Sequence, residues 1–155
     1  MVDQPQEPGL ETARIIAAAL AGGVVLFWIV TWVLTGGGQE GIAPEVLSPQ
    51  LALWILLGAL PLGFAAALIF RGRAVALAEG SGGVDPRSAS GSAGPVQTNL
   101  IISWALLEAP ALLSAVFFLL LAENLLLWVA VPVYALGVVL TFPRAEWFGE
   151  GGAPQ

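Results

Sequence analysis

The chain contains no cysteine and no histidine, and only one tyrosine and one methionine. Without cysteine it has no disulfide, no thiol nucleophile and no thiolate ligand for zinc or an iron–sulfur cluster. Without histidine it lacks the usual axial ligand of haem, a common ligand of zinc and the imidazole base of most hydrolases. We therefore expect no metal, no cofactor and no enzymatic activity.

Charged residues are also scarce, at 10% of the chain, whereas 57% of the residues are hydrophobic. This balance lies far outside that of a soluble domain. The sequence predicts an all-α integral membrane protein in which four transmembrane helices form two helical hairpins and, together, a four-helix bundle. The four apolar runs reach the roughly 17–25 residues that a spanning helix needs, and they are Ile15 to Leu34, Leu51 to Phe70, Leu100 to Ala122 and Leu125 to Phe142.

A segment that contains GSGG and SASGSAGP separates the second apolar run from the third. Its Gly/Ser-rich composition cannot bury a core and is typical of a flexible linker. The chain is thereby divided into an acidic cytoplasmic tail (1–14), a first transmembrane hairpin (15–70), the linker (71–98), a second transmembrane hairpin (99–143) and a C-terminal tail (144–155).

The basic residues are five arginines, and all of them fall on one side of the predicted membrane. They are Arg14 before the first run, Arg71, Arg73 and Arg87 between the second and third, and Arg144 after the fourth. By the positive-inside rule, both termini and the linker face the cytoplasm. The formal net charge of −6 disfavours nucleic acid as a partner, because phosphate-binding surfaces are basic. The expected surroundings are the lipid bilayer and a membrane-protein complex or homo-oligomer.

The positions of the tryptophans agree with this orientation in the membrane. Trp28, Trp32, Trp54 and Trp128 fall toward the outer ends of their predicted helices, and Trp147 lies just past the inner end of the last. Tryptophan is enriched at membrane interfaces, where its ring contacts lipid and its N–H contacts water. We expect these side chains to be interfacial anchors.

Pairs of small residues four positions apart recur in the first three runs. In a membrane such pairs allow two helix backbones to approach closely. They are Ala18/Gly22 and Ala19/Gly23 in the first run, Ala59/Gly63 in the second, and Ala105/Ala109 and Ala111/Ala115 in the third.

Glu108 lies in the middle of the third apolar run, where an ionised carboxylate is costly. Neighbours three, four or seven positions away on a helix share its face, and several of these are alanines. We therefore expect Glu108 to point at another helix inside the bundle and to have a hydrogen-bond partner. The alanines expected to pack near it are Ala105, Ala109, Ala111 and Ala115.

No arginine lies within an apolar run, so Glu108 has no evident ion-pair partner. Desolvation without a cation favours the protonated acid near neutral pH. A protonated carboxyl can donate a hydrogen bond to a free carbonyl, to Ser103 or to Ser114. It can also release and rebind its proton, which makes Glu108 the candidate proton-binding residue.

Pro61, Pro110 and Pro132 lie within apolar runs and are expected to kink their helices. Each removes a backbone donor and frees the carbonyl four residues earlier, at Leu57, Leu106 and Trp128. Membrane helices tolerate proline because neighbouring groups satisfy such carbonyls. Alternatively Pro110, which follows Glu108 closely, opens the helix around a protonatable site.

The stretch ALLEAPALLSAVFFLLLAEN, residues 105–124, resembles the carboxylate helix of the proteolipid subunit c of rotary ATP synthases and vacuolar ATPases. Glu108 matches the proton-carrying glutamate of that family, and Ala105 and Ala109 match its flanking alanines. The resemblance covers about twenty residues and implies proton binding within a helical hairpin. In the four-span vacuolar form the acid lies on the fourth helix, whereas Glu108 lies on the third.

The whole chain also looks like small four-span bacterial membrane proteins of unassigned function that share an ALxEAxAL segment. That resemblance implies no activity. We expect the protein to lie in the bacterial inner (plasma) membrane.

Two classes of function follow. One is a structural or accessory membrane protein, non-enzymatic, in which Glu108 is a buried protonatable group. The other is a subunit c-like proteolipid that binds or translocates protons through Glu108. A small-molecule transporter is a third alternative, whose polar lining would have to come from Glu108 and a few serines and threonines.

Overall fold

The computed structural model describes residues 8–80 and 93–144. This part of the chain forms four α-helices, which are α1 (Pro8–Leu34), α2 (Pro49–Gly80), α3 (Ala93–Leu121) and α4 (Asn124–Thr141). All four are long and apolar enough to cross a membrane. The all-α class and the four apolar helices are therefore confirmed.

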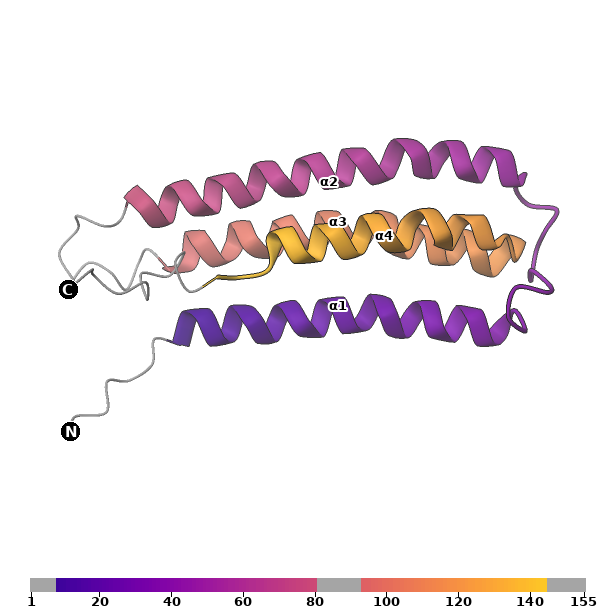
Figure 1. Cartoon of the computed structure of the whole chain (residues 1–155), viewed down its shortest axis with the longest axis horizontal. Helices are drawn as coiled ribbons and strands as arrows, with labels where there is room; N and C mark the ends of the chain where they lie inside the picture. The colour runs from indigo at the N-terminus through magenta and orange to yellow at the C-terminus, as the bar shows by residue number, and fades with distance from the viewer. Residues whose placement is uncertain (1–7, 81–92, 145–155) are drawn as a thin grey trace.

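α3 is the central helix. It packs against α1, α2 and α4, whereas α1 has its main contact with α3 alone. In the view of Figure 1, α2 and α1 lie on opposite sides of the α3/α4 pair. The loop after α1 thus leads to a helix on the far side of α3, and the two helices of the expected first hairpin do not pack along each other.

α2 and α3 both extend into the segment predicted to be a linker. α2 continues past Phe70 to Gly80, and α3 begins at Ala93. The sequence RGRAVALAE that follows Phe70 consists mostly of good helix formers, and Arg73 lies over the Phe70 ring at 5.2 Å. α2 and α3 thus extend into the two ends of the predicted linker. Residues 1–7, 81–92 and 145–155, among them Arg87 and Trp147, lie outside the described part of the chain.

The loop between α1 and α2 covers the end of α3. The backbone N–H groups of Ile42 and Ala43 donate to the carbonyls of Leu119 and Leu120, at 3.1 and 3.2 Å. These carbonyls belong to the last turn of α3, which no residue of the helix itself can satisfy. Ala122 then turns the chain with a φ of 53°, in the left-handed conformation that ends many helices. This arrangement fixes α4 directly beside α3.

The packing tests the pairs of small residues. Ala111 and Ala115 are fully buried, as predicted. Ala105 and Ala109 are exposed, so in the described part of the chain this pair does not lie in the buried core. The α-helical period explains the difference, because Ala105 and Ala109 lie on the flank of α3 that no other helix covers.

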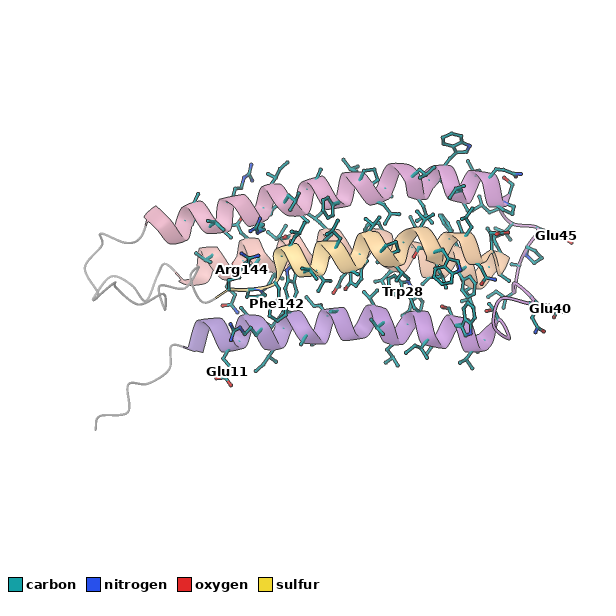
Figure 2. The ribbon with its side chains drawn as sticks, viewed as in Figure 1. Glu11, Trp28, Glu40, Glu45, Phe142 and Arg144 are labelled. Carbon is teal, nitrogen blue, oxygen red and sulfur yellow. The ribbon has the colours of Figure 1, made fainter. Side chains whose placement is uncertain are left out.

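Charged side chains gather at the two ends of the molecule. Glu11 and Arg144 lie at the end where α1 begins, and Glu40 and Glu45 lie at the opposite end (Figure 2). Between the ends the surface is apolar, so the molecule has the charge distribution of a membrane-spanning protein.

Candidate functional site

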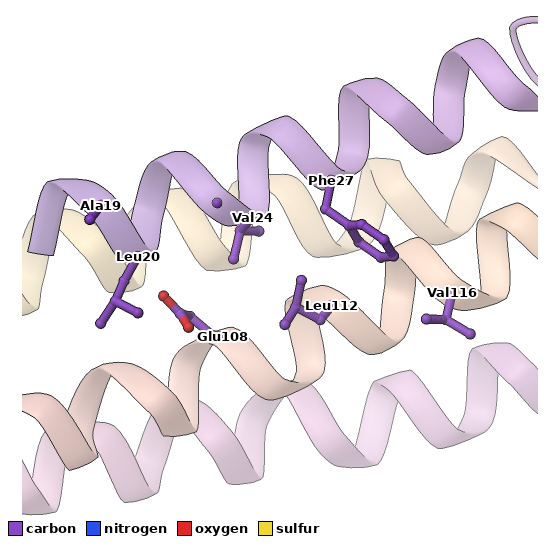
Figure 3. A pocket seen from close by; sticks show the side chains of 8 residues that line it. Ala19, Leu20, Val24, Phe27, Glu108, Leu112 and Val116 are labelled. Atoms are coloured by element: carbon purple, nitrogen blue, oxygen red, sulfur yellow. The ribbon is translucent and has the colours of Figure 1, made fainter. Parts of the chain in front are cut away.

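A groove with a volume of about 530 Å³ lies between α1 and α3. Its α3 side is formed by Glu108, Leu112 and Val116, which follow one another at a spacing of one helical turn. Its α1 side is formed by Ala19, Leu20, Gly23, Val24 and Phe27. Figure 3 shows the carboxyl of Glu108 pointing from α3 toward α1 beside Leu20, at one end of the row of lining side chains.

The groove opens sideways to the molecular surface. Ala19, Gly23 and Val116 are exposed, whereas Val24 at the bottom of the groove is buried. A Cβ atom added at Gly23 would meet nothing within 4 Å. The small pair Ala19/Gly23 therefore does not bring α1 close to α3. Instead its missing side chains leave the space opposite Glu108 open.

Glu108 is half-buried, and its Oε1 atom is buried without a hydrogen-bond partner among the described residues. The two serines suggested as partners bind elsewhere. Ser103 donates to the carbonyl of Ala67 on α2 at 2.8 Å, and Ser114 donates to the carbonyl of Ala111 at 2.6 Å. For Oε1 the expected hydrogen bond is absent, because α1 offers only apolar side chains at this depth.

The carbonyl that Pro110 frees does not serve Glu108 either. Leu106 is the residue concerned, and its carbonyl oxygen lies 2.6 Å from the position that a Cβ of Gly63 would occupy. This oxygen therefore faces α2, on the other side of α3. Pro110 is buried at the same contact, whereas Pro61 and Pro132 are exposed, and the helices continue through all three prolines.

Aromatic side chains close the space behind Glu108. Trp28 of α1 donates from Nε1 to the carbonyl of Ala111 at 3.2 Å, and its ring meets Tyr134 of α4 edge-on at 5.5 Å. A cavity of only about 10 Å³ remains between Glu108 and Tyr134, which is room for about one water molecule. The N–H of Trp28 was expected to contact interfacial water, but it donates instead to the Ala111 carbonyl inside the protein. Trp54 and Trp128, at 70% and 74% exposure, keep the exposure expected of lipid-facing anchors.

The buried serine and threonine hydroxyls form no polar path through the described helices. Each donates to a backbone carbonyl, as Thr31 does to Trp28, Thr35 to Thr31 and Thr141 to Gly137. Ser103 and Ser114 do the same. Within residues 8–80 and 93–144, no group of three or more metal-ligating side chains comes together.

Sequence reasoning singled out Glu108 and Gly23 but did not bring them together. It missed Leu20, Val24 and Phe27, which face Glu108 only because α1 packs on α3 and not on α2. The available signal was the Ala19/Gly23 pair, which reads equally well as a close contact and as an open space.

Comparison of the chain with models of protein families, with curated proteins and with solved structures gave no match.

Proposed function

We propose that this chain is a structural or accessory integral membrane protein without enzymatic activity, which packs in a membrane complex or homo-oligomer. The protein would lie in the bacterial inner membrane, with both termini in the cytoplasm and the four helices inserted as two connected pairs. The start of α1, the end of α2 and the end of α4 lie at one end of the molecule (Figure 1), and the nearness of Arg14, Arg71, Arg73 and Arg144 to these helix ends supports this orientation.

The observation that carries the proposal is the hydrogen bonding of the buried serine and threonine hydroxyls. In the described helices the five buried Ser and Thr residues each donate back to a backbone carbonyl. Four of these bonds lie within one helix or at its end, and that of Ser103 joins α3 to α2, so these hydroxyls leave no polar surface along which a solute could cross. Glu108 is the one acidic side chain at mid-helix in these spans, so a transporter or enzyme would have little to act with.

The mass of the protein in native membranes tests the accessory role. Polymer-extracted native nanodiscs, analysed by mass photometry, are expected to contain an assembly heavier than one chain. A single chain per disc at every expression level would contradict the proposal.

The second candidate is a proton-binding proteolipid, in which Glu108 is the working group. The sideways opening of the groove at Glu108 favours it, because a proton carrier in a rotor ring presents its acid at a helix surface. Glu108→Gln keeps the shape of the side chain but cannot titrate. Infrared difference spectra of the two proteins in nanodiscs therefore isolate the carboxyl band of Glu108. A band that keeps one protonation state across the physiological pH range supports the structural role, and one that interconverts near neutral pH supports proton handling.

A further inference from the structure

We propose that the groove between α1 and α3 binds a lipid-soluble molecule with one hydrogen-bond-donating head group, an alcohol or an amine. The head would lie at Glu108 and the apolar body would extend toward Phe27 and Val116. This binding site goes beyond the accessory role and does not depend on it.

The size of the groove fits a small molecule. Its volume of about 530 Å³ falls within the range of about 300–1,000 Å³ typical of ligand pockets. The other cavities described beside α3, at about 10 Å³ each, are far too small for such a ligand. A transmembrane helix, in turn, is much larger than the groove and could insert only a few side chains.

The shape of the groove has a direction. Each wall extends over nine residues, from Ala19 to Phe27 and from Glu108 to Val116, and the eight steps between its ends correspond to about 12 Å at 1.5 Å per residue. Glu108 lies at one end, and the rest of the lining is apolar (Figure 3). A slender molecule with a polar group at one end matches this arrangement.

The depth of Glu108 limits the kind of head group. The apolar span of α3 extends from Val96 to Leu121, so Glu108 lies about 18–20 Å from either end of it. The polar head of a phospholipid remains at the membrane surface and does not reach this depth. The ligand must therefore be soluble in the hydrocarbon core as a whole, and it can enter through the sideways opening.

The chemistry of Glu108 selects a donor. The carboxyl of Glu108 lines the groove, and a carboxyl oxygen can accept a hydrogen bond whether the acid is ionised or neutral. Arg14, Arg71, Arg73 and Arg144 lie toward the ends of the helices, so no described cation is available to balance an anionic ligand beside the carboxyl. A hydroxyl or amine in the groove would donate a hydrogen bond to this carboxyl.

The test is photolabelling of the full chain in nanodiscs with a decan-1-ol that carries a diazirine on its far carbons. Mass spectrometry should place the label on the groove walls, between Ala19 and Phe27 or between Glu108 and Val116. An excess of decan-1-ol or decylamine should reduce the labelling at least tenfold, whereas decane and decanoic acid should have little effect. Decanol or decylamine, whichever competes better, then identifies the head group.

Two glycines provide matched variants. Gly22→Leu and Gly23→Leu add the same side chain to α1, and neither glycine has an atom within 4 Å of its added Cβ. Only Gly23 lines the groove. Gly23→Leu should lower labelling about tenfold and Gly22→Leu should leave it unchanged. Glu108→Leu should abolish the preference for decanol over decane.

Three results would overturn the proposal. Label spread evenly over the exposed apolar faces, or insensitive to Gly23→Leu, would show that no discrete site exists. Equal competition by decane would remove the role of the head group. Disulfide crosslinking of Gly23→Cys between two chains would assign the groove to a second copy. None of these depends on whether the protein assembles with others through its remaining surfaces.

Discussion

α1 and α2 both carry glycines where they pack on α3, but the two contacts are packed differently. On the α2 side, Gly63 lies so close to α3 that an added Cβ would be 2.6 Å from the Leu106 oxygen. On the α1 side, Gly22 and Gly23 have no atom within 4 Å of an added Cβ, and a groove remains. The same small residues thus make a close contact in one place and an open space in the other.

The two interfaces differ in the hydrogen-bonding groups that each pair of helices satisfies. α2 and α3 meet where Pro110 has freed a carbonyl, and Ser103 of α3 donates to the Ala67 carbonyl of α2. α1 and α3 are joined by one hydrogen bond from the indole of Trp28 to the Ala111 carbonyl. Between the same two helices, Glu108 has no hydrogen bond at Oε1 among the described residues. The α2/α3 interface is closely packed at Gly63, whereas the α1/α3 interface leaves a groove at Gly23 and Glu108.

The largest expected effect is at the close contact. Gly63→Ala places a methyl group against the backbone oxygen of Leu106, which cannot move without displacing α3. We expect a loss of unfolding free energy of about 1–3 kcal/mol, measured by titration of mixed micelles with SDS and followed by circular dichroism. Gly58→Ala on the same helix is the control, because nothing lies within 4 Å of its added Cβ and alanine favours the helix. Equal losses in the two variants would show that α2 and α3 are not in close contact.

The next effect has the opposite sign and lies at the open groove. The carboxyl of Glu108 is half-buried, and its Oε1 has no hydrogen-bond partner among the described residues. Glu108→Leu replaces it with an apolar side chain that suits the apolar lining of the groove. We expect a gain in unfolding free energy of about 1–2 kcal/mol, since an unpartnered polar group is costly to bury. Glu108→Gln should gain less because it keeps a polar head. A loss of stability in Glu108→Leu would mean that the carboxyl has a stabilising partner.

The tryptophans show how far the sequence can be interpreted. Apolar length predicted the four helices, because a span of about 20 residues is set by membrane thickness. The sequence did not predict which helices touch, since lipid-facing and protein-facing residues are equally apolar. Trp28 and Trp54 both lie toward the predicted outer ends, yet Trp28 is bonded inside and Trp54 is 70% exposed. The groove was missed for the same reason, because it depends on α1 packing against α3.

Trp28→Phe tests the bond that joins α1 to α3. It keeps an aromatic ring near Tyr134 but removes the donor to the Ala111 carbonyl. We expect a loss of about 1 kcal/mol, the usual net contribution of one hydrogen bond. Trp32→Phe, one turn further along α1, is the control because Trp32 stacks on Phe118 and makes no described hydrogen bond to α3 through its ring. If both variants lose the same amount, ring packing and not the hydrogen bond joins the two helices.

The smallest effect separates a bond between helices from a bond within one. Ser103 and Ser114 are both fully buried on α3, but Ser103 donates across to α2 and Ser114 donates three residues back along its own helix. We expect Ser103→Ala to lose about 0.6 kcal/mol, the average measured for hydrogen bonds between membrane helices. Ser114→Ala should change little, because its carbonyl partner Ala111 also accepts from Trp28. A larger loss at Ser114 than at Ser103 would mean that this carbonyl, at the meeting point of α1 and α3, depends on the serine, and the α1/α3 interface would then be more strongly built than its open groove indicates.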